Sequence, residues 1–438
     1  MSPTAYPTIR IAACDLNGRM RGKRVPGRAL AGMDKGVRMP FSALNVDLWG
    51  HDIENSPLVF ETGDADGVLV PTGRGPVPMP WLDRPSALVP MTMRHESGRP
   101  FAGDPRAALE AVLARYAARG WEVVAATEME FTLVDDSGET MLPVIDPHSG
   151  RRLAHGAVLS IQELDAFDAF FSDLYDGCED MGIPADNIIA EAGVGQFEVT
   201  LTHQTALRAA DDAWLFKALV QGLARKYKMA ATFMAKPYMD DAGNGMHVHF
   251  SVLDSEGRNI FSDGGPKGTD LLASAVAGCL AAMPDSTLIF APFGNSYDRL
   301  VPGAHAPTAA VWAYENRTAA IRIPGGPPVA RRIEHRSAGG DVNPYLLLAT
   351  VLGAGLVGIE DELTPPEPIS GNAYAIADAP ALAADWTGAI DRLEQSALMR
   401  RILPPDLIDY LVMTKRQECA VFGEMDPEKH WESLIETA

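Results

Sequence analysis

The sequence predicts an α+β fold with two parts. A small β-rich N-terminal domain, residues 1–100, precedes a large domain, residues 101–438, built on an antiparallel sheet with flanking helices. Three observations predict this division. Alternating, strand-like segments occur in both parts, clearly capped helical segments occur only after residue 100, and a proline-rich run lies between the two parts.

The N-terminal part begins with a predicted β-hairpin. Residues 9–15 and 20–25 alternate loosely between apolar and polar side chains, and Asn17-Gly18 between them is a strong hairpin signal. Residues 42–49 are expected to be extended. A proline-rich run follows and predicts an extended connection, because proline suits neither a regular helix nor a central strand; it comprises Pro71, Pro76, Pro78, Pro80, Pro85 and Pro90.

Helix-capping residues mark the start of the large domain. Asp104 is a good N-cap and Pro105 suits the first helical position, so a helix is expected over residues 107–118, ended by Gly120. Asn343 and Pro344 predict a long apolar helix to about residue 359 in the same way. The other expected elements are a strand at 121–133, a helix at 164–181, a strand with a glycine-rich bend at 189–201, and helices at 204–228 and 405–421.

The composition excludes several classes of protein. The net charge of -21 over 438 residues argues against a nucleic-acid binder, which needs a basic surface. The most apolar stretches, around residues 271–283 and 346–357, are too short for a membrane span, and no signal peptide is expected. Four scattered cysteines without a CxxC pair indicate neither a disulfide framework nor a zinc site, and they favour a reducing cytoplasm.

The most informative stretch is residues 243–251, with the sequence Gly-Asn-Gly-Met-His-Val-His-Phe-Ser. Successive strand side chains face opposite sides of a sheet, so Met246 and its alternate neighbours form an apolar face. His247, His249 and Ser251 share the other face. By itself this pattern also fits two solvated histidines on an exposed strand.

Two further stretches carry pairs of glutamates. Glu128 and Glu130 are two residues apart on a predicted strand and therefore share a face, where two carboxylates repel unless a cation lies between them. Glu191 and Glu198 flank the glycine-rich bend. Each pair also fits a plain surface strand or turn.

A third polar face is rich in arginine. Alternation places Arg332, Glu334 and Arg336 on one side of a strand, and Arg317 and Arg322 lie in a nearby segment. Arginines in apolar strands need phosphate or carboxylate partners, which they bind bidentately. An ion-pair network within the sheet is the simpler explanation for any one of them.

Together these faces offer five glutamates, two histidines and several arginines. Carboxylates with at most one imidazole per ion suit Mg²⁺ or Mn²⁺ better than zinc. Two such ions beside an arginine cluster are typical of phosphoryl transfer from ATP. The chain has neither a P-loop motif nor the protein-kinase motif set.

Taken in their order along the chain, these motifs resemble those of the glutamine synthetase family. The resemblance extends from about residue 9 to the C-terminus. The resemblance rests on the two glutamate stretches, on Lys236-Pro237 leading into the 243–251 strand, and on three later runs. These are Asn295–Gly303 (Asn-Ser-Tyr-Asp-Arg-Leu-Val-Pro-Gly), Asn316-Arg317 with Ile321–Pro324 (Ile-Arg-Ile-Pro), and Arg332–Arg336 with Asn343-Pro344-Tyr345.

The resemblance implies roles for individual residues. Glu130, Glu191 and Glu198 would bind a first metal ion, and Glu128, His247 and Glu334 a second one nearer the nucleotide. The remaining roles concern the substrates: Arg299 and Arg336 would hold glutamate and the transferring phosphate, Arg317, Arg322 and Arg332 the ATP phosphates, Gly243 glutamate, and His249 and Ser251 the nucleotide side.

The resemblance also implies a β-grasp-like N-terminal domain and a homo-oligomer of stacked rings, a dodecamer of two hexamers. Active sites would lie between neighbouring subunits, with Asp47 reaching the adjacent site. In the implied reaction, the γ-carboxylate of glutamate attacks the γ-phosphate of ATP, and an amine then attacks the γ-glutamyl phosphate.

The sequence departs from the family at the ammonium site. Glutamine synthetases carry a tyrosine and a glutamate after the Val-Pro-Gly, whereas this chain continues Ala304-His305-Ala306-Pro307. Residues 332–352 and 371–374 resemble the glutamate–polyamine ligase branch. We therefore expect a ligase that joins glutamate to a polyamine, alkylamine or ethanolamine, with His305 as a candidate base. An ammonia-using glutamine synthetase is the alternative. A catalytically silent sensor is disfavoured because every predicted metal ligand and arginine is retained.

Overall fold

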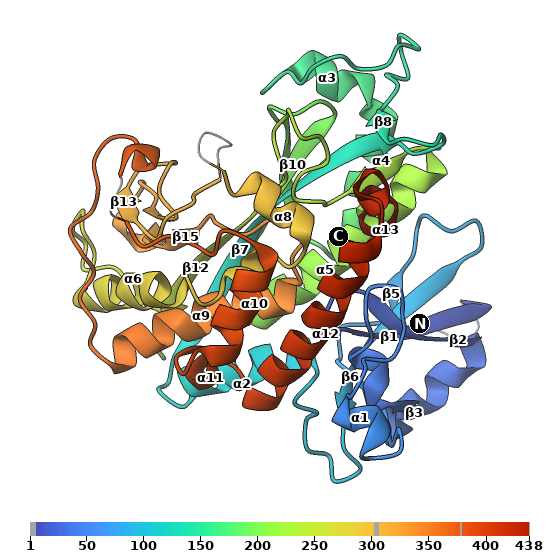
Figure 1. Cartoon of the computed structure of the whole chain (residues 1–438), viewed down its shortest axis with the longest axis horizontal. Coiled ribbons are helices and arrows are strands. Elements are labelled where there is room, and N and C mark those ends of the chain that lie inside the picture. The colour runs from blue at the N-terminus through green and yellow to red at the C-terminus, as the bar shows by residue number, and fades with distance from the viewer. Residues whose placement is uncertain (1–5, 302–305, 377–378, 438) are drawn as a thin grey trace.

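The structure is a computed structural model that describes residues 6–301, 306–376 and 379–437. It contains two sheets with helices around the larger one (Figure 1). The strands are β1 (Thr8–Cys14), β2 (Met20–Pro26), β3 (Val37–Pro40), β4 (Asp66–Pro71), β5 (Val77–Pro78), β6 (Ser86–Arg94), β7 (Glu122–Asp135), β8 (Leu142–Pro143), β9 (Ala185–Ala190), β10 (Gln196–Thr205), β11 (Ala230–Thr232), β12 (Met246–Leu253), β13 (Trp312–Tyr314), β14 (Ile321–Ile323) and β15 (Ile333–His335).

The helices cluster after residue 100, as the sequence predicts. The α-helices are α1 (Pro57–Phe60), α2 (Pro105–Ala117), α3 (Ile161–Ala166), α4 (Asp168–Met181), α5 (Ala206–Lys226), α6 (Asp270–Ala282), α7 (Thr287–Phe290), α8 (Gly294–Arg299), α9 (Pro344–Glu360), α10 (Trp386–Gln395), α11 (Met399–Ile402), α12 (Pro405–Glu424) and α13 (His430–Leu434). Short 3₁₀ helices are η1 (Gly27–Lys35), η2 (Phe41–Leu44), η3 (Pro328–Ala330), η4 (Ala373–Ala375) and η5 (Pro427–Lys429). None of the helices in the described ranges is long and apolar enough to cross a membrane.

The N-terminal sheet has the strand order β2-β1-β6-β4-β3, with β5 paired to β6. The predicted hairpin is confirmed: β1 and β2 pair antiparallel, and the Asp15 carboxylate accepts the backbone N–H groups of Asn17 and Arg19, both at 2.9 Å. In contrast, β1 and β6 run parallel. The fold is therefore a mixed sheet, and its β-grasp-like character stays a prediction.

Three sequence-based expectations need correction. Pro90 lies inside β6, the central strand, at the place where β6 stops pairing with β5 and begins pairing with β4, so its missing N–H breaks no ladder there. Residues 42–49 are not extended, because η2 and a loop occupy them. The helix expected over 164–181 is two helices, α3 and α4, which meet at Phe167.

The N-terminal sheet packs against the rest of the chain on one face. Ala12, Cys14 and Leu88 belong to the same buried cluster as the core of the large sheet, whereas Ile9 and Ile11 belong to a separate N-terminal cluster. Helix α12 contacts loops of the N-terminal part: Asn17 donates to Glu418 at 2.6 Å, and Asn45 donates to Thr414 at 2.8 Å. This apolar packing continues across residue 100. The domain boundary that the sequence predicts there therefore stays a prediction.

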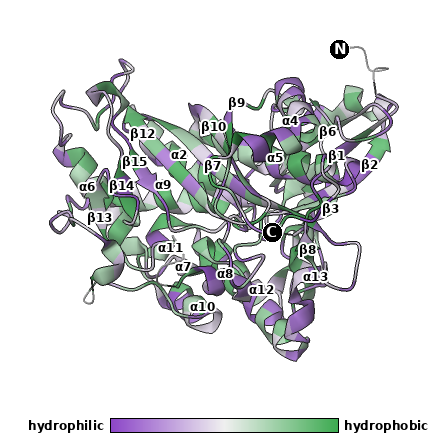
Figure 2. Cartoon of the chain, turned by 90° about the horizontal axis from the view of Figure 1, so that it is seen from above, coloured by the Kyte–Doolittle hydropathy of each residue, from purple (hydrophilic) through white to green (hydrophobic). Residues whose placement is uncertain are grey.

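The large sheet has the order β13-β14-β15-β12-β7-β10-β9, and β8 and β11 also pair with β7. All its pairings are antiparallel except that of β13 with β14. The apolar side chains of β7 and β12, including Met129, Phe131 and Phe250, are almost fully buried. Helices α2, α5 and α9 lie against this side (Figure 2). The opposite, polar side of the sheet is left for a site.

Candidate active site

Strand register brings the predicted carboxylates together. On β7, Glu128 pairs with His247 of β12 and Glu130 pairs with Glu198 of β10. On the far side of β12, His249 pairs with Glu334 of β15. The alternation predicted from the sequence is therefore confirmed, and four strands present their polar residues on one face.

Two compact groups on this face have the make-up of metal sites. Glu128, His247 and Glu334 form one, and Glu130, Glu198 and His247 form the other; within each group the ligand atoms lie within 4.8 Å of one another. The first group has the three members predicted for the second metal. In the other group His247 takes the place of Glu191, which lines the same cavity but belongs to neither compact group.

The electrostatics of these carboxylates favour a bound cation. Burial and the neighbouring glutamates raise the pKa of Glu198 to about 9, and burial with Glu130 raises the pKa of Glu191 to about 7. Burial also acts to raise the pKa of Glu128, but hydrogen bonds from His247 and His249 outweigh it and lower that pKa overall. Oxygen donors with one shared imidazole fit Mg²⁺ or Mn²⁺ and not a closed zinc site.

The predicted arginines surround this carboxylate cluster. Glu334 is fully buried and pairs with Arg322, at 2.7 Å from Nη1 to Oε2, and with Arg336. Arg299 is also buried, and its Nη1 donates to the carbonyl of Ser337 at 3.1 Å. Arg317 is exposed but lines the same cavity. Guanidinium groups held in this way can neutralise phosphate or carboxylate charge.

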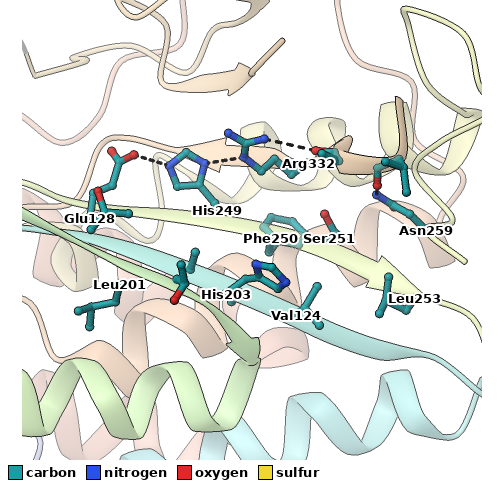
Figure 3. A pocket seen from close by; sticks show the side chains of 16 residues that line it. Val124, Glu128, Leu201, His203, His249, Phe250, Ser251, Leu253, Asn259 and Arg332 are labelled. Carbon is teal, nitrogen blue, oxygen red and sulfur yellow. Dashed lines mark hydrogen bonds and ion pairs between the residues drawn. The ribbon is translucent and has the colours of Figure 1, made fainter. Parts of the chain in front are cut away.

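Two cavities adjoin at the carboxylates. One, of about 510 Å³, contains Glu128, Glu130, Glu191, Glu198, His247, Gly243, Arg299, Arg317 and Arg336. The other, of about 460 Å³, is largely apolar and contains His249, Ser251 and Arg332 (Figure 3). Glu128 and Thr200 line both. A nucleotide with its base in the apolar cavity would thus direct its phosphates toward the metal groups.

A hydrogen-bonded chain connects the two cavities. His249 Nε2 lies 3.0 Å from Glu128 Oε1, and Arg332 Nε donates to His249 Nδ1 at 3.2 Å (Figure 3). The imidazole thereby links a carboxylate of the metal group to an arginine of the apolar cavity. Ser251 Oγ instead donates to the carbonyl of Arg331 at 2.9 Å, which ties the strand to the segment before β15.

Both glycines of the Gly-Asn-Gly loop lie so close to neighbouring atoms that a Cβ would clash with them. A Cβ on Gly243 would lie 2.2 Å from the carbonyl oxygen of Ala235, and a Cβ on Gly245 would lie 2.7 Å from Nη2 of Arg299. The Gly245 N–H donates to Glu130 Oε2 at 2.6 Å, so the loop also holds a carboxylate of the metal group. Gly243 itself lines the cavity, and its contact with glutamate stays a prediction.

One predicted residue does not join this site, and another cannot be placed relative to it. Asp47 is buried away from it: its Oδ1 accepts the N–H groups of Trp49 and His51, and its Oδ2 accepts Gln417 of α12 at 3.0 Å. Its role in a neighbouring subunit's site stays a prediction. His305 lies outside the described residues.

Sequence reasoning missed residues that line the cavities. His203 borders the apolar cavity (Figure 3), because the β10–β7 register shifts between Leu201 and Gln204. A bulge of this kind leaves no signal in an alternating pattern. Tyr374 borders the larger cavity from the short helix η4; residues 371–374 resemble a family motif, but that resemblance predicts no cavity contact for the tyrosine.

A face with two candidate metal groups, between an apolar cavity and an arginine-lined one, suits an enzyme that acts on a metal–nucleotide complex. Comparison with known proteins makes this class specific. Residues 102–433 match the glutamine synthetase catalytic domain family, so the chain belongs to the glutamine synthetase family.

Three curated relatives are similar over most of their length. The chain is 38% identical to the gamma-glutamylputrescine synthetase PuuA of Escherichia coli K12 over 374 residues, 84% of this chain and 79% of that protein. It is 30% identical to a glutamate–isopropylamine ligase of a Pseudomonas species, covering 93% and 90%. It is 29% identical to a gamma-glutamylethanolamide synthetase of Streptomyces coelicolor, covering 95% and 89%.

Comparison with solved structures also finds close matches to this fold. A GmaS complex with ADP superposes with a TM-score of 0.84 at 27% identity, covering 98% of this chain and 96% of that one. The fold is thus of the glutamine synthetase type. Family membership and these relatives identify the chain as an ATP-dependent glutamate–amine ligase and leave the amine open.

Proposed function

We propose that this enzyme joins the γ-carboxylate of glutamate to an organic amine, through γ-glutamyl phosphate, at the expense of ATP. The observation that carries the proposal is the acceptor side of the site. Where the family places an ammonium-binding glutamate, the chain reads Ala304-His305-Ala306, which has no carboxylate. The three curated relatives, named as ligases for putrescine, isopropylamine and ethanolamine, support an organic acceptor.

The proposed reaction has two steps. A γ-carboxylate oxygen of glutamate attacks the γ-phosphorus of ATP, and the bond to ADP breaks. The amine nitrogen then attacks the γ-carbonyl carbon, phosphate leaves, and the nitrogen loses a proton to form the amide. Both steps pass through anionic transition states, which preorganised positive groups stabilise.

The residues of the chain have distinct roles in this proposal. Arg299 and Arg336, which are both buried and line the larger cavity, hold glutamate and the transferring phosphoryl group. Arg317, Arg322 and Arg332 face the ATP phosphates, His249 and Ser251 line the nucleotide cavity, and Gly243 contacts glutamate. Mg²⁺ or Mn²⁺ would be held by Glu130, Glu191 and Glu198 at one position and by Glu128, His247 and Glu334 at the other. Those ions supply charge neutralisation at the phosphates.

We further propose the quaternary and cellular context that the family implies. The chain would form stacked rings, a dodecamer, in which Asp47 serves the adjacent subunit's site and His305 acts as the base. The four cysteines are free and three of them are buried, which fits a reducing cytoplasm.

The test is phosphate release by the purified protein with Mg²⁺, ATP and glutamate. Ammonia, putrescine, spermidine, ethanolamine, methylamine and isopropylamine are compared one at a time. We expect at least a tenfold higher kcat/KM for one organic amine than for ammonia. Best turnover with ammonia would overturn the proposal and make the enzyme a glutamine synthetase in activity.

A matched control keeps this assay interpretable. Arg336→Lys removes the bidentate guanidinium but retains its positive charge, so amine-dependent turnover should fall about a hundredfold. Release that persists unchanged in this variant would show that the phosphate comes from a contaminant and not from this site.

A further inference from the structure

We propose that Asp341 is a positioning residue for Arg299. Its buried carboxylate offsets the attraction of Glu130 and keeps the guanidinium available to the glutamate substrate. The inference rests on the proposed function, in which Arg299 holds glutamate. Asp341 is 2% exposed and does not line the larger cavity, so it acts on the substrate only through its neighbours.

Arg299 is a buried cation with a competing carboxylate close by. The position that a Cβ would take at Gly245 lies 2.7 Å from Nη2 of Arg299 and 3.4 Å from Oε2 of Glu130. Opposite charges this close in a buried site attract each other strongly. Within the described part of the chain, Arg299 nevertheless forms no ion pair with Glu130. Its Nη1 donates instead to the carbonyl of Ser337 at 3.1 Å, so another group must hold the guanidinium back.

Asp341 supplies the opposing negative charge. Burial lowers the pKa of Arg299, and the carboxylates of Glu130 and Asp341 both act against this effect. Conversely, burial raises the pKa of Asp341, while a hydrogen bond from Ser296 and the positive charges of Lys217 and Arg299 act against it. Asp341 and Arg299 therefore favour each other's charged form, and the guanidinium is attracted to two carboxylates.

The helix that carries Arg299 also fixes the carboxylate of Asp341. Arg299 is the last residue of α8, and Ser296 lies about one helical turn before it. The hydroxyl of Ser296 donates to Oδ2 of Asp341 at 2.5 Å. Oδ1 of Asp341 has no hydrogen-bond partner in the described part of the chain. Its negative charge is buried and acts at short range on the neighbouring cations.

The backbone around Asp341 joins this pair to the rest of the site. Residues 337–341 connect β15 to α9, and the carbonyl of Ser337 in this segment accepts Arg299. The Gly340 N–H donates to the carbonyl of Asn244, in the Gly-Asn-Gly loop, at 2.8 Å. One segment therefore holds the carboxylate, the guanidinium and the glycine loop together, which suits a role in positioning.

Asp341→Asn tests the role of the charge. The asparagine oxygen can still accept the Ser296 hydroxyl and the side chain keeps its shape, but the negative charge is gone. Arg299 should then turn toward Glu130. At saturating ATP and amine, we expect the KM for glutamate to rise about tenfold to a hundredfold, with the KM for ATP unchanged.

A second substitution separates positioning from simple stability. Lys217 is the other cation near Asp341, and its Nζ donates to the carbonyl of Val342 at 2.9 Å. Asp341→Asn removes the anion that these two cations share, so the unfolding midpoint should fall. Adding Lys217→Met removes one cation and should restore the midpoint. The KM for glutamate should stay raised, because Arg299 still lacks its opposing charge.

Asp211→Asn is the matched control. Asp211 is also a buried carboxylate, it pairs with Arg106 at 2.8 Å, and it lines neither cavity of the site. This variant should lower the unfolding midpoint without raising the KM for glutamate.

Three results would overturn the positioning role while the proposed function stands. These are a glutamate KM that Asp341→Asn leaves unchanged, a KM that Lys217→Met restores together with the midpoint, and an equal rise in Asp211→Asn. If the wild type prefers ammonia to every organic amine, or forms no γ-glutamyl amide, the proposed function itself fails.

Discussion

Replacing Glu198 with glutamine should make the metal-free protein more stable while it removes a proposed metal ligand. Glu198 lies between like charges, and its folded pKa is raised to about 9, mainly by burial and then by Glu128 and Glu130. An unfolded glutamate titrates near pH 4.3. Between these values the folded state binds a proton that the unfolded state does not, so stability falls as pH rises.

The size of the effect follows from this difference. At about 1.4 kcal/mol per pH unit, roughly three units between pH 4.3 and pH 7.5 correspond to a cost of about 4 kcal/mol. Glutamine cannot ionise and avoids this cost. In wild type, a bound Mg²⁺ removes the cost by taking the place of the proton, so the ion should stabilise wild type more than Glu198→Gln.

Thermal melting in EDTA and in Mg²⁺ measures both effects. In EDTA, Glu198→Gln should melt several degrees above wild type at pH 7.5 and at nearly the same temperature at pH 5. In Mg²⁺ the wild type should gain more than the variant. A variant that melts below wild type in EDTA at pH 7.5 would refute the reasoning, because it would show that the carboxylate is not strained by its neighbours.

Three other substitutions test separate parts of the account. Gly245→Ala should push Arg299 from its position, because the new Cβ would lie 2.7 Å from its Nη2 atom. The kcat/KM for glutamate should then fall about a hundredfold, whereas ATP binding measured by calorimetry should persist. Glu334→Ala leaves the buried Arg336 and the partly buried Arg322 without their carboxylate and should lower stability by about 3 kcal/mol in chemical denaturation; an unchanged midpoint would count against that ion-pair network. Asn343→Ala removes the N-cap of α9, whose side chain accepts two backbone N–H groups, and should cost about 1 kcal/mol without changing any KM.

Local patterns predicted the strand faces and helix starts of the large domain well. The alternation of residues 246–251 has a direct structural cause, because one side of β12 must be apolar to pack on the helices. Asp104 and Asn343 cap their helices as expected, each accepting two backbone N–H groups. These features depend only on neighbouring residues, which the sequence shows directly.

Features that depend on distant partners were not predictable. Pro90 is tolerated in the central strand β6 only because two different strands pair on either side of it. The register shift that brings His203 to the apolar cavity depends on β7. Likewise, Val158 reaches the larger cavity because its loop bonds to β9, a contact between segments about 30 residues apart that no periodicity encodes.

The structure brings the predicted metal-ligand candidates together, but it groups them differently from the family-based assignment. Each described metal-ligand candidate lines the larger cavity or joins a compact group. His247, however, bridges both groups, because β12 lies beside β7, and Glu191 stands apart at the end of β9. Strand order decides such groupings, and sequence motifs do not record it.

Direct competition between ammonia and an organic amine tests the central claim. The enzyme is given Mg²⁺, ATP, glutamate and equal concentrations of ammonium and of the organic amine with the highest kcat/KM, and the products are quantified by mass spectrometry. The account predicts the γ-glutamyl amide of that amine in at least tenfold excess over glutamine. Glutamine as the main product would contradict it and show that the chain retains the ammonia-dependent reaction despite its altered acceptor side.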